Sequence, residues 1–146
     1  MASITQIVLP TPGIEELRTE ARAEGYKFVD TLVNDWDSGL NRFDAPGEVL
    51  CGHFDRGVLV AVGGVNIDPF TGDRETGRIR RVYVRAAWRN QGVGRALVMH
   101  LVEHARRHFK CVRLRAENPE AARLYERLGF VPTEDPAATH IFIAKQ

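Results

Sequence analysis

The feature that most constrains this chain is a turn with two glycines, RNQGVGRAL, at residues 89–97. The preceding stretch RIRRVYV has the apolar character of a strand, and a long amphipathic segment follows the turn. Glycine is a poor helix former, by about 1 kcal/mol relative to alanine. Two glycines at the start of a helix therefore indicate a close approach to the backbone, either by a ligand or by a sheet on which the helix packs.

The segment after the turn predicts the longest helix of the chain, residues 92–109. Val93, Leu97, Leu101 and Ala105 recur at helical spacing and form one apolar stripe. Such a stripe must be buried against another element, and the strand-like runs on either side supply a sheet.

The remaining elements predict an α/β (α+β) domain with a mixed sheet. Gly25 is the expected end of the first helix, and Asn118 followed by Pro119 is a typical start for the last one. Helices are expected at residues 14–24, 27–36 and 119–128, and strands at residues 4–9, 48–54, 58–67, 78–84, 111–115, 130–132 and 139–144.

The totals are those of an ordinary globular protein. The 146 residues predict a single domain, 1–146, and 44% of them are hydrophobic, which is enough for a sizeable core. No apolar run approaches the ~20 residues of a membrane span. The first residues lack the pattern of a signal peptide, so a cytoplasmic location is expected. Cys51 and Cys111 lie in apolar runs and are expected to be free thiols.

The net charge of +1 hides an asymmetry along the chain. Residues 1–73 hold five Lys/Arg and twelve Asp/Glu, whereas residues 74–115 hold twelve Lys/Arg and two Asp/Glu. Such a distribution attracts an anion at one place and a cation at another.

The glycine turn has the chemistry of an anion site. Backbone N–H groups at a helix N-terminus lack intrahelical partners and carry the positive end of the helix dipole. Gly92 and Gly94 leave these groups accessible, and Arg89 and Arg95 add charge, so the turn is suited to a pyrophosphate. The third glycine of a dinucleotide fingerprint is replaced by Leu97, and a Walker A sequence is absent, which disfavours nicotinamide and nucleoside-triphosphate ligands.

Two linked motifs resemble the GNAT superfamily of acetyl-CoA-dependent N-acetyltransferases. The first is RRVYVRAAWRNQGVGRALVMHLVEHA, in which Arg89, Gly92 and Gly94 match the Gln/Arg-x-x-Gly-x-Gly/Ala signature of the family. The second is RAENPEAARLYERLGF, in which Asn118 and Tyr125 precede a Gly-Phe pair. The two motifs cover residues 78–131 closely.

The resemblance implies a central sheet of about six to seven strands with a splayed strand pair and flanking helices. It places acetyl-CoA, as cosubstrate, in the gap between the splayed strands, with its pantetheine along the backbone of Val82, Tyr83 and Val84. The residues implied at its pyrophosphate are Arg89, Asn90, Gln91, Gly92, Val93, Gly94 and Arg95.

The resemblance also implies roles in acetyl transfer. Tyr125 is the candidate acid for the departing thiolate and also a cofactor contact, and it lies two helical turns after Asn118. Asn118 is expected to bond pantetheine, to cap its helix, or both. Many relatives carry a glutamate as general base at the position of Arg78, so the base is left open. Glu75, His53, His140 and a water relay are the alternatives.

The acceptor is expected to be a primary amine on a small molecule or peptide. Trp36, Asn41, Phe43 and Asp44 are the candidate contacts, in a region where several carboxylates favour a cationic amine. Trp36 and Phe43 have a second interpretation, which is that they cover the core. No metal is expected: His100, His104 and His108 are spaced by four, but the charged residues between them favour a solvated helix face.

The prediction is therefore an acyltransferase whose partners are acetyl-CoA and an amine acceptor, with a homodimer as one option for its assembly. Neither nucleic acid nor a membrane is expected as a partner. Two alternatives stay open, a non-catalytic acyl-CoA sensor and a nucleic-acid-binding module that uses the basic middle of the chain. The second is disfavoured because no aromatic stacking platform interleaves the basic residues.

Overall fold

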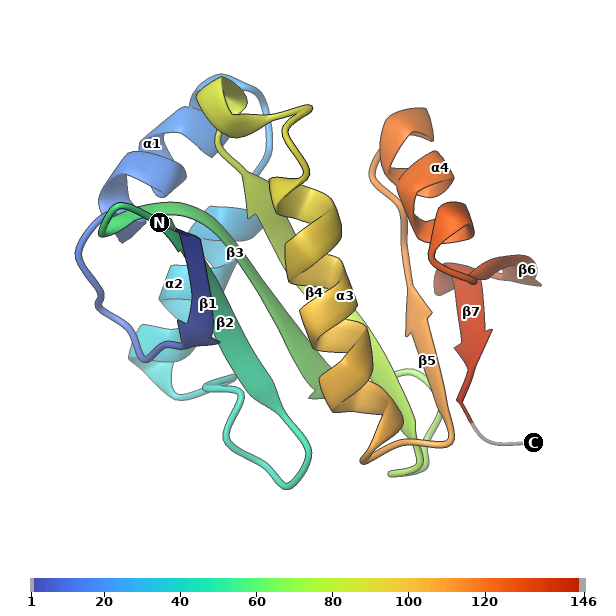
Figure 1. The fold of residues 1–146 in the computed structure, drawn as a ribbon. Coiled ribbons are helices and arrows are strands. Elements are labelled where there is room, and N and C mark those ends of the chain that lie inside the picture. Colours follow the sequence, from blue (N-terminus) through green and yellow to red (C-terminus); the bar gives the residue numbers. More distant parts are fainter. Residues whose placement is uncertain (1, 145–146) are drawn as a thin grey trace.

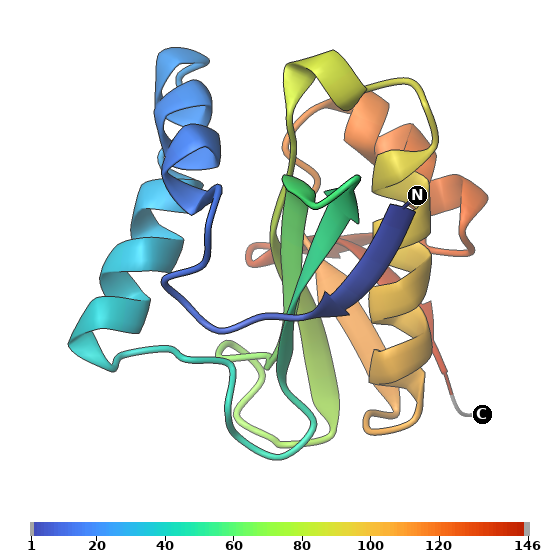
Figure 2. The same ribbon diagram turned by 60° about the vertical axis from the view of Figure 1, so that its left-hand side comes forward.

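The computed structural model describes residues 2–144, which form a seven-stranded mixed sheet with helices on both faces (Figure 1, Figure 2). The strand order is β1-β2-β3-β4-β5-β7-β6. The strands are β1 (Ala2–Gln6), β2 (Val49–Asp55), β3 (Val58–Ile67), β4 (Thr76–Val84), β5 (Cys111–Leu114), β6 (Val131–Asp135) and β7 (Ala138–Ile143). The helices are α1 (Ile14–Ala23), α2 (Phe28–Ser38), α3 (Val93–Arg106) and α4 (Pro119–Arg127), with a 3-10 turn η1 (Ala86–Trp88).

The helices divide the core into two clusters. Helices α1 and α2 stand on one side of the sheet and α3 stands on the other, as Figure 2 shows. Leu17, Leu32 and Leu59 belong to the cluster under α1 and α2, and Leu97 and Leu101 belong to the cluster under α3. Each of these leucines is at most 1% exposed, and full burial of such a side chain contributes about 1.5–3 kcal/mol.

Helix α3 buries the stripe that its sequence pattern predicts. Val93, Leu97, Leu101 and Ala105 are all buried against β3 and β4. The helix ends at Arg106, three residues before the predicted end, because the chain turns there and brings Phe109 back into the core, where it is 2% exposed.

The two central parallel strands, β4 and β5, separate after a short stretch of pairing. Thr76, Gly77 and Arg78 of β4 pair with β5, whereas the rest of β4, up to Val84, pairs only with β3 on its other side. The predicted splayed strand pair is therefore β4 and β5. The edge of β4 from residue 79 to residue 84 faces a gap within the sheet, and α4 borders that gap on the side of β5 (Figure 1).

Strand β4 also carries a β-bulge. Gly64 of β3 pairs with Arg80 and Val62 pairs with Tyr83, so one residue of β3 stands opposite two residues of β4. Arg81 lies in this bulge with φ of 61°, in the left-handed region that only glycine adopts without strain. Bulges re-aim the side chains around them and occur often next to functional sites.

The predicted fold class is confirmed, and the differences are at the ends of elements. The first strand covers Ala2–Gln6 rather than residues 4–9, because its pairing with β2 ends before the Leu9–Pro10 turn. Strand β4 begins at Thr76, two residues early, because Thr76 and Gly77 already pair with β5. The short strand predicted at residues 130–132 extends to Asp135 in a hairpin with β7.

Cys51 and Cys111 are free thiols on β2 and β5. Within residues 2–144 no helix combines the length and apolar character needed to cross a membrane.

Candidate functional site

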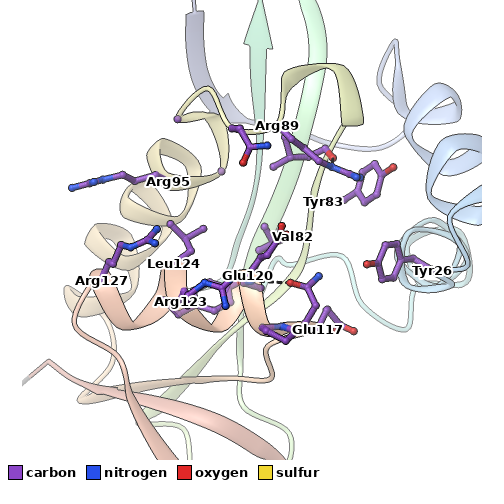
Figure 3. A pocket seen from close by; sticks show the side chains of 18 of the residues that line it. Tyr26, Val82, Tyr83, Arg89, Arg95, Glu117, Glu120, Arg123, Leu124 and Arg127 are labelled. Carbon is purple, nitrogen blue, oxygen red and sulfur yellow. Dashed lines mark hydrogen bonds between the residues drawn. The ribbon is translucent and has the colours of Figure 1, made fainter.

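The main cavity of the molecule lies where β4 and β5 separate. It has a volume of about 1020 Å³ and lies between the second half of β4, the N-terminus of α3 and helix α4. Figure 3 shows Tyr83 and Arg89 on one side and Glu117, Glu120 and Arg123 on the side of α4. The lining residues that the sequence motifs predicted are Val82, Tyr83, Val84, Arg89, Asn90, Gly92, Gly94, Arg95, Asn118 and Tyr125.

The wall formed by β4 presents unpaired backbone to the cavity. Val82 and Val84 line the cavity on the stretch of β4 that has lost its pairing with β5. A strand edge of this kind offers N–H and C=O groups to an extended ligand, in the way that a further strand would accept them.

The glycine turn forms one end of the cavity. Gly92 is the N-cap of α3 with φ of 84°, and a Cβ at this residue would meet nothing within 4 Å, so open space lies beside the backbone. A Cβ on Gly94 would meet Val84 at 3.4 Å and Leu124 at 3.8 Å, which are ordinary contacts. Gly92 is therefore required by its backbone conformation, and Gly94 keeps the entrance between β4 and α4 free of a side chain.

Two residues of the turn face away from the cavity. The Gln91 side chain donates to the carbonyl of Ala87 at 2.9 Å, and Val93 is buried in the core under α3. Any contribution of these two residues to a ligand would come from their backbone N–H groups.

Arg89 lines the cavity, but its charge is already balanced within the chain. Its guanidinium makes two hydrogen bonds to Glu24, at 2.6 and 2.8 Å, and its Nε donates to the carbonyl of Val84 at 2.9 Å. The hydrogen bond from Arg89 lowers the pKa of Glu24. The sequence motif suggests Arg89 as a counter-charge for phosphate, whereas here it ties α1 to the end of β4.

Tyr83 belongs to the same network. Its hydroxyl lies 2.7 Å from Glu20 and 2.6 Å from Glu24, and because it has one proton it donates to one carboxylate at a time. The backbone N–H of Ala86 also donates to Glu20, at 2.9 Å. Helix α1 thus supports the loop that leads from β4 to the glycine turn.

Helix α4 adds cations that the sequence motifs did not single out. Arg123 and Arg127 are spaced by four residues, so they share one face of α4, and both line the cavity together with Arg95 of α3. All three side chains are exposed, and none has a carboxylate within ion-pair distance among residues 2–144. The sequence signal for Arg123 and Arg127 is their spacing of four residues, which places them on one face of the nine-residue helix that begins at Pro119.

Asn118 starts α4 in the way its sequence predicts. Its side-chain oxygen accepts a hydrogen bond of 2.8 Å from the N–H of Ala121, and Pro119 occupies the first helical position. The capping interpretation of Asn118 is confirmed. The residue also lines the cavity.

Tyr125 lies two turns further along α4, 7% exposed, with its ring packed edge-on against Phe130 at 5.8 Å between centroids. Burial raises the pKa of Tyr125, and the charge of Glu117 raises it further. The phenol therefore stays protonated at any working pH and acts as a hydrogen-bond donor. Both Tyr125 and Glu117 line the main cavity and also a smaller one beside it.

The smaller cavity has a volume of about 160 Å³ and opens on the sheet face that carries α2. Phe28, Val82, Glu117 and Tyr125 line both cavities and mark their junction. The remaining lining residues of the smaller cavity are Phe70, Arg78, Ile79, Arg80, Arg81 and Arg115. Glu117 is thus the carboxylate that lines both cavities. No sequence signal singles it out, because the recognisable motif begins at the next residue, Asn118.

The general-base candidates from the sequence lie away from this junction. Glu75 pairs with Lys110 at 3.1 Å, and the imidazole of His140 bonds Glu126 at 2.8 Å. His53 is buried on β2, two strands away from the gap, and its Nδ1 has no hydrogen-bond partner among the described residues. Arg78, at the family's glutamate position, is buried beside Asp68 at 3.3 Å.

The four acceptor candidates also lie outside both cavities. Phe43 is 3% exposed and packs over Gly64, where a Cβ would come within 2.3 Å of its ring. Asn41 exchanges hydrogen bonds of 2.9 Å with Asn66. Trp36 packs against the cluster under α1 and α2, and Asp44 is exposed on the loop. The packing of Phe43 and Trp36 agrees with the second interpretation, in which these side chains cover the core.

His100 and His104 of α3 and His108, just beyond its end, do not gather around a common point. His104 bonds the carbonyl of Gly47 at 3.0 Å, and its ring stacks on His108 with 4.6 Å between centroids. In the part of the chain that the structure describes, no group of three His, Cys, Asp or Glu side chains has the arrangement of a metal site.

A mixed sheet whose central parallel strands part around a cavity, beside a glycine turn at a helix N-terminus, defines an α/β protein with a binding cleft inside its own sheet. Residues 11–130 match the acetyltransferase (GNAT) family. The chain therefore belongs to that family, and the resemblance drawn from the two sequence motifs is confirmed.

Solved structures share this fold over nearly the whole chain. A candidate acetyltransferase from Exiguobacterium sp. 255-15 has a TM-score of 0.88 at 23% identity, covering 98% of this chain and 93% of that one. The ribosomal-protein-S18-alanine N-acetyltransferase of Escherichia coli has a TM-score of 0.73 at 18% identity, covering 100% and 96%. A candidate acetyltransferase from Salmonella typhimurium, solved with its cofactor acetyl-CoA, has a TM-score of 0.74 at 17% identity, covering 99% and 95%.

Proposed function

We propose that this protein is an N-acetyltransferase that transfers the acetyl group of acetyl-CoA to a primary amine. The observation that carries the proposal is the gap between β4 and β5, because it joins an unpaired strand edge, a glycine turn and Tyr125 in one cavity. The family membership and the neighbour solved with acetyl-CoA support the same ligand.

The residues present fit an extended ligand that carries phosphates. The backbone of Val82 and Val84 offers hydrogen bonds along the length of the cavity, and the helix N-terminus at Gly92 offers N–H groups and a positive potential. Arg95, Arg123 and Arg127 supply cations that have no ion-pair partner within residues 2–144, and they would take the role at the phosphates that the sequence motif gave to Arg89.

When bound, acetyl-CoA supplies an activated acetyl thioester. The chain must then remove a proton from the amine, polarise the carbonyl and assist the departing sulfur. A backbone N–H on the unpaired edge of β4 is suited to the carbonyl. Glu117 lies at the junction of the two cavities, where a carboxylate accepts the amine proton directly or through one water.

Tyr125 serves the departing sulfur as a hydrogen-bond donor. A phenol with a pKa raised above its usual value of ~10 is a weaker acid than a thiol at ~8.5, so complete proton transfer to sulfur is uphill. A hydrogen bond to the developing thiolate needs no such transfer, and it strengthens as the negative charge grows. The final proton then comes from solvent.

The proposal is tested by calorimetry with acetyl-CoA in buffer that contains EDTA, followed by an amine screen with thiol release as the readout. We expect saturable 1:1 binding without added metal and turnover with at least one class of amine. Failure to bind acetyl-CoA at millimolar concentration would overturn the proposal. Tight binding without turnover on any amine would favour the alternative of a non-catalytic acyl-CoA sensor.

A further inference from the structure

The smaller cavity has an unusual charge for a site that receives an amine. Four arginines line it, Arg78, Arg80, Arg81 and Arg115, with Glu117 as the one carboxylate of its lining. The cavity shares Phe28, Val82, Glu117 and Tyr125 with the lining of the main one, which makes it the candidate space for the acceptor of the proposed reaction.

Two arginines of this region are neutralised by the protein itself. Asp68, fully buried, lies 3.3 Å from Arg78 and 3.0 Å from Arg113, and Arg113 also pairs with Asp135 at 3.1 Å. Arg115 donates to the carbonyl of Pro136. These contacts tie the β6–β7 hairpin to β4 and β5. The charge of Arg78 is balanced by that of Asp68.

Arg80 and Arg81 are in a different position. Both are half-buried, and neither has a carboxylate within ion-pair distance or a side-chain hydrogen bond among residues 2–144. Burial lowers the pKa of each guanidinium, the charge of Arg81 lowers that of Arg80 further, and the charge of Arg78 does the same for Arg81. The carboxylates that oppose them at longer range are Asp35, Glu48 and Asp68 for Arg80, and Asp35 and Glu117 for Arg81.

The backbone is deformed at Arg80 and Arg81, which belong to the run of β4 residues, 78–82, that lines the smaller cavity. Consecutive residues of a regular strand point to opposite faces of the sheet. The bulge of β4 and the positive φ of Arg81 interrupt the alternation there. A strained backbone that brings two poorly solvated, like charges together indicates a place for an anion.

We propose that the acceptor is a small primary amine that carries an anionic group, a carboxylate or a phosphate, bound by Arg80 and Arg81. This inference rests on the proposed acetyl transfer and adds the substrate class. Guanidinium groups match both anions, because their paired N–H donors bind two oxygens at once. With the anion at the arginines, the amine lies toward Glu117 and Tyr125, where the two cavities join.

The size of the cavity limits the acceptor. Its volume is about 160 Å³, against about 1020 Å³ for the main cavity, so it is suited to a small molecule. A longer molecule would extend past Phe70, whose ring is 59% exposed and lies over Arg78 with 4.9 Å between guanidinium and ring centroid.

Two of the carboxylates behind the cationic acceptor expected from the sequence are bonded within the chain. Asp30 is neutralised by Arg18 and Arg22, both at 2.6 Å, and is not available to a ligand. Glu48 is bonded to Asn66 and to the N–H of Ile67. Neither of these two carboxylates is therefore open to a cationic amine.

The test compares acetylated products with and without an anionic group, so that the basicity of the acceptor amine plays no part. Binding to the protein saturated with CoA is measured by calorimetry for N-acetyl-β-alanine and its amide, and for 2-acetamidoethyl phosphate and N-acetylethanolamine. N-acetylputrescine is the cationic comparison. We expect one anionic member to bind at least about tenfold more tightly than its neutral partner, the usual effect of a charged hydrogen-bonded pair. The carboxylate and phosphate pairs show which anion is preferred.

Variants assign the preference to residues. Arg80→Gln and Arg81→Gln are each expected to reduce it to about threefold or less while acetyl-CoA affinity stays within about twofold. The matched control is Arg74→Gln, on an exposed loop outside both cavities, which should keep the full preference. Equal binding of the anionic and neutral members in both pairs, tighter binding of N-acetylputrescine, or a preference that survives both substitutions would overturn the inference.

Failure of the proposed function has a separate signature. A protein that binds neither CoA nor acetyl-CoA refutes the acetyltransferase proposal. In that case, binding of the anionic and neutral compounds is compared in the absence of CoA, because Arg80 and Arg81 line the smaller cavity without a bound cofactor. If CoA binds and the anionic products show no advantage, the acetyl transfer stands and the substrate class is wrong.

Discussion

Replacement of Gly92 by aspartate and by asparagine isolates the charge of the ligand at the glycine turn. Gly92 has φ of 84°, and Asn and Asp are the residues other than glycine that most often adopt that region. A Cβ at this residue meets nothing within 4 Å, so both side chains extend into the open space beside the N-terminus of α3. The two variants have nearly the same shape and differ by one negative charge.

The magnitude follows from the geometry. Both variants should lose about 1 kcal/mol of stability from the left-handed backbone. The aspartate regains part of this loss, because a negative charge near a helix N-terminus contributes about 0.3–1 kcal/mol. Toward a diphosphate, one carboxylate repels each unit charge by about 1 kcal/mol at 4 Å in water. Two phosphate charges then weaken binding by about 2 kcal/mol, roughly thirtyfold.

The assay is a pair of titrations with acetyl-CoA at low ionic strength, repeated at high salt, together with the free energy of unfolding of each variant. We expect the asparagine variant to bind within about threefold of the parent and the aspartate variant to bind more weakly than both. Added salt should narrow the difference, because exposed charges are screened within about 10 Å at 0.1 M.

Equal affinities of the two variants for acetyl-CoA would refute the reasoning. In that case the phosphates lie elsewhere, and Arg95, Arg123 and Arg127 would need another explanation. Instability cannot imitate the expected result, because the aspartate variant is the more stable of the two.

Three further substitutions test the site and its support. Tyr125→Phe keeps the ring and removes the hydroxyl, so kcat and kcat/KM should fall together by up to about 10²-fold with acetyl-CoA affinity unchanged; turnover at the parent rate would make Tyr125 a packing residue. Glu117→Gln should lower kcat/KM by about 10²-fold, whereas Glu134→Gln, exposed on β6, should leave kcat/KM unchanged. Asp68→Asn leaves two buried guanidiniums without their shared carboxylate and should reduce the free energy of unfolding by about 3–5 kcal/mol in urea titrations. A loss below about 1 kcal/mol would mean that water replaces the lost charge.

Local signals predicted most of the fold correctly. The stripe of α3, the hairpin between β2 and β3, and the Asn118–Pro119 start of α4 each depend on residues close together in the chain, and the structure confirms all three. The ends of β1 and β4 were wrong by a few residues, because strand ends are set by pairing with distant partners.

The candidate site was only half visible in the sequence. Its glycine turn and Tyr125 belong to motifs that can be recognised locally, and the structure places both at one cavity. Glu117, Arg80 and Arg81 have no motif of their own. Their position depends on a bulge in β4 and on the separation of β4 from β5, which are properties of the sheet as a whole.

The sequence by itself determined the family, the order of elements and the location of the glycine turn, because these follow from hydrophobic periodicity and from residues within one or two helical turns of each other. Only the tertiary structure decided which charges remain free. Arg89 and Glu24 lie 65 residues apart and neutralise one another, as do Arg113 and Asp68 over 45 residues. Ion pairing depends on distance in space, and a count of charges along the chain cannot show that Arg80 and Arg81 are left facing a cavity.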